Sequence, residues 1–466
     1  MERYDLAIIG AGTAGMAAAI RADELGARTA LINAGMPLGG TSLHWGCIPS
    51  KHLIFVARAL QAAEQPPFAA VQSGRVRLDL EQLREGKDNL VRHLREHKYA
   101  NVLDGLANVR LLDGWARLVG AKELDISGKQ VFAERVIVAS GASPRVPPFE
   151  GLDRVSYLTY REALALEHIP LTLLVVGAGP TGLELAQLYS RLGSVVTVLE
   201  RGPRILPQQE PAVSEALRQA FEDENIEVHN GAAVKRVVGK DRRIRLEASF
   251  GERSRALEAE AILMATGQSG NTQRLGLAGI GVSIDRRGFV SVDDYMESSV
   301  PGIYAAGDVT GDPGLDTAAA MQGRLAAENA LGTTRRKLDL AALPLGVFTS
   351  PEVASVGLTE EACREIHGDS RARVVPMSEV PLAVATGATR GFLKLVATPE
   401  GKVVGVHIIC ERAIESIQTA ALAIRQGLTI DDLVRMPHVY PSFTQAIKLA
   451  AQSFHRSVES MACCIG

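Results

Sequence analysis

Cysteines at two places in the sequence could do redox or metal chemistry. Cys47 lies in a Gly-Cys-Ile-Pro-Ser-Lys stretch that predicts a helix start, and Cys463 and Cys464 are neighbours close to the end of the chain. A helix N-terminus favours the thiolate form of cysteine, which is both the nucleophile and the metal ligand. Two adjacent thiols suit a soft, thiophilic ion. The sequence therefore predicts thiolate chemistry, with the tail pair as a trap for something thiophilic.

These cysteines also have purely structural explanations. A tail pair arises by drift, or it crosslinks chains in an oxidising compartment. The chain runs almost at once into an apolar stretch at residues 6–9, which leaves no room for a secretory leader. We therefore expect a cytoplasmic protein with reduced thiols, in which Cys363 and Cys410 are small buried hydrophobes.

The composition indicates a large globular protein that binds neither nucleic acid nor membrane. The chain has 466 residues, of which 46% are apolar, and a formal net charge of −3. This length predicts two or three domains of about 150 residues each, and no segment approaches the ~18 apolar residues of a membrane span. The charge offers no electrostatic footprint for nucleic acid or anionic lipid. Residues 83–99 predict a helix with a solvated, charged face.

The elements that must position this chemistry begin with two copies of a strand, a glycine turn and a helix. Apolar runs at 6–9 and 173–176 lead into the two turns, and a helical run at 183–192 follows the second. The first glycine permits the tight turn, the second lets the backbone approach a pyrophosphate, and the third packs the helix on the strand. The helix N-terminus favours the phosphate. The two sets of glycines are Gly10, Gly12 and Gly15, and Gly177, Gly179 and Gly182.

The residue that ends the next strand differs between the two units. Glu200 ends the apolar run at 195–199, where an acid usually binds the ribose hydroxyls of a dinucleotide. Asn33 takes this place in the first unit, and its amide would form a hydrogen bond with a ribose hydroxyl without the charge assistance of a carboxylate. Arg201 and Arg204 either meet a 2′-phosphate or are solvated, so NADPH and NADH both stay open. Glu200 would repel that phosphate, which favours NADH.

Three further strand ends are marked by small residues. Residues 136–142 and 262–267 each predict a buried strand that meets a turn, as a chain needs where it re-enters a dinucleotide domain. Residues 302–309 place Asp308 after an apolar strand, next to Gly307. Asp308 therefore either serves a ligand or caps a helix.

In order and type, these motifs resemble those of the flavoprotein pyridine nucleotide-disulfide oxidoreductases over essentially the whole chain. The turn at 10–15, the segment 40–51, the turn at 177–182 and the Gly307-Asp308 pair carry the resemblance. The family includes lipoamide dehydrogenase, glutathione reductase and mercuric reductase. The resemblance implies an α/β fold with two Rossmann-like dinucleotide-binding domains, a C-terminal α+β dimerisation domain and hence a homodimer.

The resemblance also implies the domain boundaries and the cofactors. The FAD-binding domain would be discontinuous, at 1–148 and 270–338, with the NAD(P)-binding domain at 149–269 and the dimerisation domain at 339–466. FAD would bind the first glycine unit, and NADPH or NADH the second. A β-hairpin is expected within the dimerisation domain, with strands at 391–396 and 402–409.

Individual cofactor contacts follow from the same resemblance. Asp308 would hold the ribityl chain, and Lys51 would pair with Glu184 near the reactive nitrogen of the flavin. The residues expected to contact the two cofactors are Gly10, Gly12, Gly15, Asn33, Gly40, Thr41, Lys51, Gly141, Asp308, Gly177, Gly179, Gly182, Glu200, Arg201 and Gly267.

The active centre of the family is a pair of cysteines with four residues between them, and this chain keeps only one. Cys47 is present, and Ser42 stands where the other cysteine belongs. By the resemblance, Cys47 lies against the flavin, and the missing thiol is the one that reaches out to substrate. A hydroxyl is a poor ligand for a soft metal. Either Ser42 is native and the protein uses one thiol, or it is a Cys→Ser change that stops turnover, which we favour.

The C-terminal region argues against reduction of an organic disulfide. Family members with that activity carry a His-Pro-Thr motif and a following glutamate, which shuttle the proton of dithiol exchange. Here Tyr440 and Gln445 stand in those places, and tyrosine, with an ordinary pKa of ~10, is a poor base at neutral pH. His438 is expected to be a loop or interface histidine.

A tyrosine at this place, followed by a vicinal cysteine pair, resembles the mercuric reductase branch of the family. That resemblance implies that Cys463 and Cys464 collect Hg(II) as a thiol complex and pass it to Cys47, with Tyr440 beside its path or as a ligand. Reduced flavin would then convert Hg(II) to Hg(0). With Ser42 in place, we expect Hg(II) binding with weak or absent turnover. No Cys-x-x-Cys domain precedes Met1, so we expect a catalytic core alone.

Two other functions stay open at this point. One is a one-thiol NAD(P)H oxidase, or a persulfide or disulfide reductase, that uses Cys47 alone. The other is a flavin-containing protein that sequesters Hg(II) without reducing it. If NAD(P)H consumption depends on Hg(II), the protein is a mercury reductase rather than a one-thiol oxidase or reductase. If the Ser42→Cys variant releases Hg(0), it is a mercury reductase rather than a protein that only sequesters Hg(II).

Overall fold

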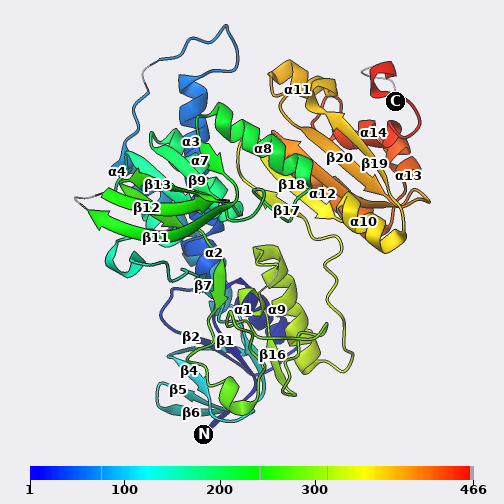
Figure 1. Cartoon of the computed structure of the whole chain (residues 1–466). Coiled ribbons are helices and arrows are strands. Elements are labelled where there is room, and N and C mark those ends of the chain that lie inside the picture. Colours follow the sequence, from blue (N-terminus) through cyan, green and yellow to red (C-terminus); the bar gives the residue numbers. More distant parts are fainter. Residues whose placement is uncertain (75, 241–242, 312, 462–466) are drawn as a thin grey trace. The chain divides into compact units, whose positions relative to one another are not determined.

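The computed structural model describes residues 1–461 except 75, 241–242 and 312 (Figure 1). The chain forms two compact units. The first unit contains Met1–Leu53, Asp79–Val146 and Gly267–Asp339. The second contains Ile54–Leu78, Pro147–Thr266 and the chain from Leu340 onward.

A seven-stranded sheet forms the centre of the first unit. Most of its strands are parallel apolar runs, as expected for strands that are buried on both faces. Two short antiparallel strands extend it at one edge. Its path runs through β3 (Val109–Asp113), β2 (Thr29–Asn33), β1 (Glu2–Ile9), β6 (Lys129–Val138), β5 (Glu123–Ile126) and β4 (Ala116–Leu118), and β16 (Ile303–Ala305) also pairs with β6.

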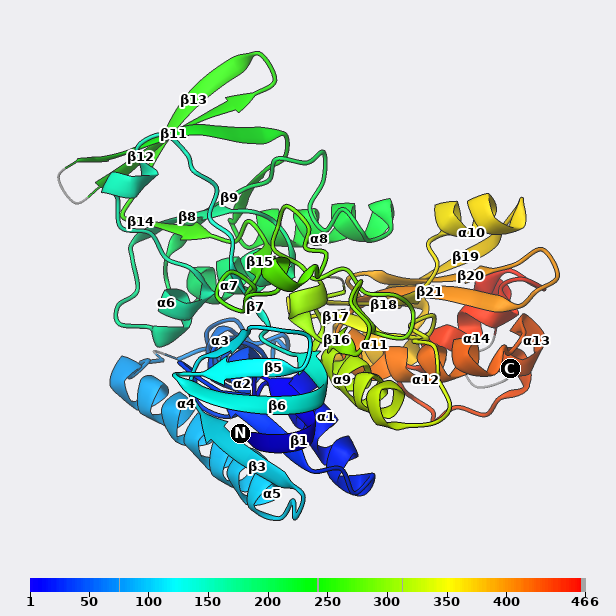
Figure 2. The same cartoon turned by 90° about the horizontal axis from the view of Figure 1, so that it is seen from below.

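Two alanine-rich helices pack together on one face of this sheet. α1 (Thr13–Glu24) follows β1 and lies along α9 (Asp316–Leu331) (Figure 2). Their core includes Leu6 and Ile8 of β1. Because the facing side chains are small, the helix backbones approach closely. The other described helices of this unit are α2 (Gly40–His44), the first part of α3 (Cys47–Glu64), α4 (Leu80–Arg95), the π-helical turn η1 (Glu96–Ala100), α5 (Asn101–Asp104) and the 3-10 helices η3 (Ala278–Ile280) and η4 (Asp308–Thr310).

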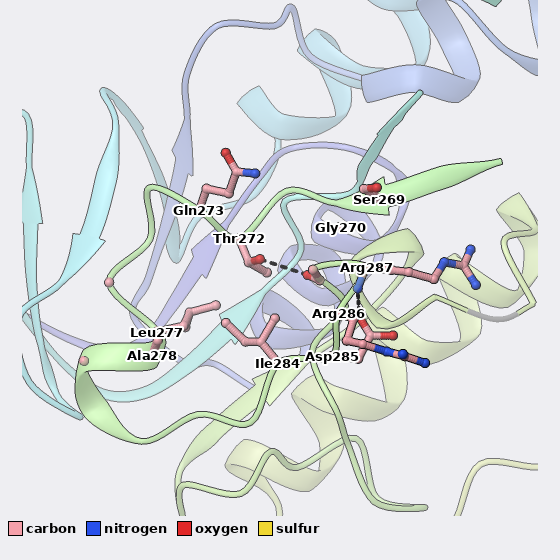
Figure 3. A pocket seen from close by; sticks show the side chains of 13 residues that line it. Ser269, Gly270, Thr272, Gln273, Leu277, Ala278, Ile284, Asp285, Arg286 and Arg287 are labelled. Atoms are coloured by element: carbon pink, nitrogen blue, oxygen red, sulfur yellow. Dashed lines mark hydrogen bonds between the residues drawn. The ribbon is translucent and has the colours of Figure 1, made fainter. Parts of the chain in front are cut away.

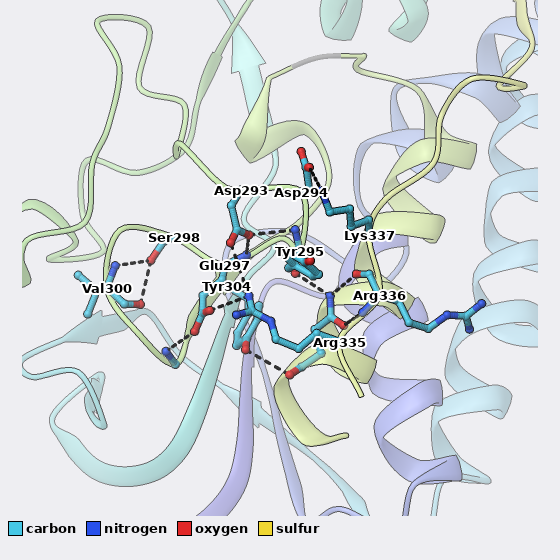
Figure 4. A network of polar contacts seen from close by, with 12 residues as sticks. Asp293, Asp294, Tyr295, Glu297, Ser298, Val300, Tyr304, Arg335, Arg336 and Lys337 are labelled. Carbon is cyan, nitrogen blue, oxygen red and sulfur yellow. Dashed lines mark hydrogen bonds and ion pairs between the residues drawn. The ribbon is translucent and has the colours of Figure 1, made fainter. Parts of the chain in front are cut away.

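Polar contacts hold the segment that follows α9 (Figure 4). Asn329 Nδ2 donates to the carbonyl oxygens of Tyr295 and Arg336 at 2.8 and 2.9 Å. Arg335 pairs with Glu297 at 2.8 Å, and its guanidinium lies 4.4 Å from the centre of the Tyr295 ring. The chain therefore leaves the first unit from a fixed position on its surface.

The nucleotide-binding part of the second unit contains a four-stranded parallel sheet and a three-stranded antiparallel sheet. α7 begins at Pro180 rather than at the predicted Leu183, because proline fits the first helical turn without an N–H. The parallel sheet has the order β10 (Glu227–His229), β9 (Val195–Leu199), β8 (Thr172–Val176) and β14 (Ala261–Met264). The other elements are α6 (Tyr160–Ala165), α7 (Pro180–Arg191), α8 (Pro211–Asp223), β11 (Ala232–Lys240), β12 (Arg243–Phe250) and β13 (Arg253–Ala259).

The C-terminal part of the second unit is built on a five-stranded antiparallel sheet. Its strand order is β17 (Leu345–Val347), β18 (Glu352–Gly357), β21 (Val403–Cys410), β20 (Phe392–Ala397) and β19 (Arg371–Pro376). The pairing of β20 with β21 confirms the predicted hairpin. Its helices are α10 (Glu360–His367), α11 (Pro381–Thr386), α12 (Ala413–Gln426), α13 (Ile430–Arg435) and α14 (Gln445–Gln452).

Cys363 and Cys410 are buried in this C-terminal part, as predicted. Burial raises the pKa of both thiols, so they stay protonated and inert at neutral pH. Together, the two strand, turn and helix units and the antiparallel C-terminal sheet confirm the predicted α/β fold class. In the part of the chain that the structure describes, no helix has the length and apolar character needed to cross a membrane.

Candidate functional site

The two glycine turns have the same backbone geometry. Gly10 and Gly177 have φ angles of +111° and +106°, in a region that favours glycine. A Cβ atom on either would lie 2.3 Å from a carbonyl oxygen, that of Ala139 in the first unit and that of Ala265 in the second. Each of these carbonyls follows the neighbouring parallel strand, so both turns pack against the sheet in the same way.

Both helices that follow the turns begin without a side-chain cap from any described residue. The N-cap positions are Gly12 for α1 and Gly179 for α7. The first N–H groups of each helix and the positive end of its dipole can therefore bind an anion such as a pyrophosphate. These two helix starts fit the phosphates of FAD and of a nicotinamide dinucleotide.

The segment before the cysteine helix closes over the first glycine turn. A Cβ at Gly40 would lie 2.7 Å from Gly12 Cα, so the two backbones approach more closely than side chains would allow. Gly39 N also donates to Ala11 O at 3.0 Å. Thr41 follows Gly40 in α2. The structure thus brings Gly40 and Thr41 to the turn that was predicted to bind FAD.

Asn33 ends β2 and Asp308 follows β16, and these two strands belong to the same sheet with β1 and β6 between them. Asn33 Nδ2 donates to Met36 O at 2.7 Å, so this amide also holds the turn after β2. Asp308 is half-buried, and burial followed by the nearby Asp316 carboxylate raises its pKa. The capping alternative for Asp308 is wrong, because Gly307 holds the N-cap position of the short helix there. A half-buried carboxyl group at a strand end suits a hydrogen bond to a ligand hydroxyl.

The two predicted re-entry points lie side by side in the first unit. β7 (Ala142–Pro144) and β15 (Gln268–Gly270) form a two-stranded antiparallel ribbon. Gly141 precedes β7, and its carbonyl accepts from Asn271 N at 3.0 Å. Gly267 directly precedes β15. The exit after Val146 and the return at Gly267 therefore lie at the same place in this unit.

Cys47 is the first residue of α3, as predicted, and its thiol is exposed. Ser42 lies on α2 and is half-buried. Gly46 joins the two helices closely, because a Cβ there would lie 2.9 Å from Thr41 O and 3.1 Å from Ser42 Cα. The two positions expected to act together are therefore neighbours, although only Cys47 carries a sulfur.

Tyr99 is a site candidate that the sequence did not reveal. It lies in the π-helical turn η1, a feature often found at functional sites. Burial, followed by the charges of Asp316 and Cys47, raises the pKa of its phenol. Thr13, the first residue of α1, donates from Oγ1 to Asp316 Oδ1 at 2.6 Å. Tyr99 thus lies in the electrostatic neighbourhood of both the cysteine and the first glycine turn, but no motif marks it.

Glu184 lies on α7 in the second unit and is 7% exposed. Its Oε1 accepts a hydrogen bond from the backbone N–H of Phe348 at 2.9 Å. Lys51 lies on α3 within the first unit. The ion pair expected between Lys51 and Glu184 stays a prediction.

Glu200 is held at the second glycine turn. Its Oε2 accepts from Ala178 N at 2.8 Å, and its Oε1 accepts from Gly202 N at 2.6 Å. The carboxylate that was predicted at the end of β9 therefore points at the predicted dinucleotide site. Arg201 is exposed and Arg204 is half-buried.

Tyr440 lies in the loop before α14 and is 47% exposed. His438 in the same loop is half-buried, with Nδ1 at 3.2 Å from Met436 O. Burial lowers the pKa of His438, so this imidazole is neutral at pH 7. Gln445 is the first residue of α14. In this loop, Tyr440 is therefore more exposed than His438.

The predicted metal ligands of the tail, Cys463 and Cys464, lie outside the described residues. Among the residues that are described, no group of three or more His, Cys, Asp or Glu side chains could hold a metal ion.

A cavity of about 470 Å³ lies elsewhere in the first unit (Figure 3). Its wall includes Thr272, Asp285, Arg286 and Arg287. Thr272 Oγ1 donates to Gly288 O at 2.9 Å across it. None of the residues predicted to bind a cofactor or a metal lines this cavity, so it is distinct from the predicted site.

Comparison with known proteins gives matches over nearly the whole chain. The pyridine nucleotide-disulphide oxidoreductase family model matches residues 4–323, and the dimerisation domain of that family matches residues 343–451. The mercuric reductase of Lysinibacillus sphaericus is 37% identical over 466 residues, which are 100% of this chain and 85% of that protein. The mercuric reductase of Streptomyces lividans is 38% identical over 470 residues, which are 99% and 98% of the two chains.

Solved structures give the same picture of the fold. The HOCl-induced flavoprotein disulfide reductase RclA from Escherichia coli is 26% identical, with a TM-score of 0.86 over 96% of this chain and 99% of that chain. RclA has also been solved as a Cu(II) complex, including one of a cysteine-to-serine mutant.

Proposed function

Because the chain belongs to the pyridine nucleotide-disulphide oxidoreductase family, whose members bind FAD and NAD(P)H, we propose that it is a mercury(II) reductase. It would use NAD(P)H to reduce Hg(II) to Hg(0). The observation that carries the proposal is the similarity to mercuric reductases over the full chain. The exposed Cys47 thiol at a helix start and the phenol of Tyr440 in place of a histidine base support it.

We propose that the first unit holds FAD, which supplies a two-electron reductant when bound. The uncapped start of α1, with the backbones of Gly12 and Gly40, would bind its pyrophosphate. Asn33 would contact the ribose, and Asp308 would accept from a hydroxyl of the ribityl chain. The corresponding boundaries are 1–148 and 270–338 for this domain, 149–269 for the NAD(P)-binding domain and 339–466 for the dimerisation domain.

The second glycine turn would hold the nicotinamide dinucleotide. The start of α7 offers its N–H groups to the pyrophosphate, and Glu200 accepts from the ribose hydroxyls. Glu200 is already oriented by two backbone N–H groups, so its carboxylate needs no rearrangement to meet a ligand. The remaining contacts would come from Gly141 and Gly267 to FAD and from Arg201 to the nicotinamide dinucleotide.

Hg(II) would reach Cys47 by exchange between thiolates. One Hg–S bond to Cys463 or Cys464 would break as the Hg–S bond to the Cys47 thiolate forms, so this exchange needs no net proton transfer and no histidine base. With Ser42 in place, the second tail thiolate has no inner thiolate to replace it, and Ser42→Cys would supply one. Cys47 begins α3 and is exposed, so an incoming thiol complex can reach it. The dimerisation domain supports a homodimer, in which we propose that the tail of one protomer serves the site of its partner.

Ser42 sets the sharpest test, because a second inner thiol would complete the metal site. We compare wild type, Ser42→Cys and Ser42→Ala as FAD-loaded dimers, and measure oxidation of NADH and of NADPH with and without Hg(II) together with release of Hg(0). We expect all three to accept electrons from NADPH alike, and Ser42→Cys to release Hg(0) at least about tenfold faster than the other two. NADPH oxidation that ignores Hg(II) in every variant would refute the proposal.

The second candidate is a flavoprotein that binds a thiophilic metal without reducing it. The observation that favours it is Ser42 itself, which leaves Cys47 as the one inner thiol of the described pair of helices. If Ser42→Cys binds Hg(II) tightly but releases no Hg(0), this second function is the correct one.

A further inference from the structure

Side chains from two helices that carry predicted site residues form hydrogen bonds with the segment from Phe348 to Glu352. α3 begins at Cys47, and α7 follows the second glycine turn and carries Glu184. Arg58 reaches the segment from α3. Gln187 and Arg191 join Glu184 in reaching it from α7.

From α3, Arg58 makes three contacts with the segment. Its Nη2 donates to the carbonyl oxygens of Phe348 and Thr349 at 3.0 and 2.9 Å. Its Nη1 lies 2.9 Å from Glu352 Oε1. The other carboxylate oxygen of Glu352 accepts from Ile414 N at 3.2 Å, in the first turn of α12. One guanidinium thus fixes both ends of the segment.

Side chains of α7 form hydrogen bonds with other polar groups of the same segment. Gln187 Oε1 accepts from Ser350 N at 2.7 Å, and Gln187 Nε2 donates to Ser350 O at 2.8 Å. Arg191 Nη1 donates to Ser350 Oγ at 3.1 Å. Glu184 Oε1 accepts from Phe348 N at 2.9 Å. The carbonyl oxygen of Phe348 therefore accepts a hydrogen bond from Arg58, and its N–H donates one to Glu184.

We propose that Arg58 is a positioning residue for Glu184, acting through Phe348. It lies on α3, the helix that begins at Cys47. Arg58 thereby ties the placement of the Glu184 carboxylate to the helix that carries the thiol. This inference rests on the flavin-site role of Glu184 in the proposed function, but not on mercury as the substrate.

The chemistry of the guanidinium explains why arginine is required. Its planar fork satisfies two carbonyl oxygens and a carboxylate at once, whereas a lysine ammonium is a single point that cannot span all three. Without it, Glu352, which is 8% exposed, keeps a poorly compensated charge, and two carbonyl oxygens lose a donor. The segment then shifts to recover hydrogen bonds, and the N–H of Phe348 leaves Glu184.

The first test measures the hydrogen exchange of backbone amides in the segment from Phe348 to Glu352. In the FAD-loaded dimer, hydrogen exchange of the Phe348 and Ser350 amides is compared among wild type, Arg58→Gln and Arg58→Lys. Loss of about one net hydrogen bond predicts roughly tenfold faster exchange of Phe348 in Arg58→Gln, with a smaller rise in Arg58→Lys. Ala59→Gln is the matched control, because Ala59 is the next residue of α3 and is exposed. Unchanged protection of Phe348 in Arg58→Gln overturns the proposal.

The second test is a double-mutant cycle on the flavin, with no metal present. Arg58→Gln, Glu184→Gln and the double variant are compared by the flavin midpoint potential and by the rate of flavin reduction by NADPH. If Arg58 acts through Glu184, the double variant matches Glu184→Gln alone on both readouts. Fully additive effects overturn the inference. If Arg58→Gln does not retain FAD, the same cycle is run with Arg58→Lys.

The two proposals can fail separately in these experiments. Absence of Hg(0) release in Ser42→Cys would end the mercury proposal and leave the cycle on Arg58 and Glu184 interpretable. Additive effects in that cycle would end the positioning role of Arg58 even if mercury turnover were fast.

Discussion

Lys394 Nζ lies 2.8 Å from Glu210 Oε2, and their side chains are only 11% and 5% exposed. Lys394 is on β20 of the C-terminal sheet, and Glu210 directly precedes α8 beside the nucleotide-binding sheet. Glu360 completes the cluster, with Oε2 at 2.7 Å from Lys394 Nζ and its N–H donating to Glu210 Oε1. This buried cluster joins the two parts of the second unit.

Lys394→Met should therefore destabilise the second unit strongly. The change leaves Glu210 and Glu360 as shielded carboxylates without their cation, and breaking a buried pair in this way typically costs about 3–5 kcal/mol. Thermal unfolding of the FAD-loaded protein measures the effect. Lys402→Met is the matched control, since Lys402 is exposed. Adding Glu210→Gln to Lys394→Met should recover part of the loss, and an unchanged midpoint in Lys394→Met would contradict the prediction.

The same cluster predicts a pH window for this stabilisation. Burial opposes both shifts, but hydrogen bonds within the cluster outweigh it, so the pKa of Glu210 lies below its ordinary 4.5 and that of Lys394 lies above its ordinary 10.5. A depressed Glu pKa adds stability that is lost as the pH falls through the folded value, and a raised Lys pKa adds stability that is lost as the pH rises through the folded value. His407, paired with Lys394 across β20 and β21, has its pKa lowered by burial and stays neutral above 6.5.

The stability difference between wild type and Lys394→Met should accordingly be flat from pH 6.5 to about 10, and should shrink toward both extremes. Unfolding midpoints of the two proteins across this range provide the measurement. A difference that changes steadily between pH 7 and 9 would show that another titrating group dominates.

Substitutions of two glycines in the second turn should have different effects, one on stability and the other on nucleotide binding. A Cβ at Gly182 would lie 2.1 Å from Gly177 O, whereas a Cβ at Gly179 meets no described atom within 4 Å. Gly182→Ala should therefore lower the unfolding midpoint. Gly179→Ala should leave it unchanged but raise the KM for NADPH by about tenfold, because the methyl group occupies the approach to the pyrophosphate. Equal KM values in Gly179→Ala and wild type would place the nucleotide elsewhere.

Local patterns in the sequence were enough to predict the strands and helix starts that are expected to bind the cofactors. The apolar run at 195–199 matches β9, and Cys47 begins α3, because strand alternation, glycine turns and helix starts are encoded within a few residues. The Arg58 to Glu352 pair could not be predicted, since 294 residues separate its members and neither stands in a periodic pattern. The same holds for Tyr99, whose π-helical turn and neighbours appear only in three dimensions.

Glu200 should control the choice between NADH and NADPH. Its carboxylate is fixed by Ala178 N and Gly202 N, so it presents a negative charge where the 2′-phosphate of NADPH would approach. Glu200→Gln removes that charge while keeping a hydrogen-bond acceptor for Ala178 N. We expect kcat/KM for NADPH relative to NADH to rise about tenfold, which corresponds to about 1.4 kcal/mol of removed repulsion. A ratio that does not move would assign cofactor choice to other residues.

Tyr440 should affect mercury turnover without affecting the flavin half of the reaction. Tyr440 is 47% exposed in the loop before α14, and Tyr440→Phe removes the phenol oxygen while it keeps the ring. In the Ser42→Cys background, we expect Hg(0) release to fall about tenfold with flavin reduction by NADPH unchanged, because the lost group acts only on the metal path. His438→Gln is the matched control in this loop, since the imidazole is half-buried, neutral at pH 7 and bonded through Nδ1 to Met436 O. If His438→Gln slows turnover and Tyr440→Phe does not, a proton shuttle operates here, and an organic disulfide becomes the better substrate.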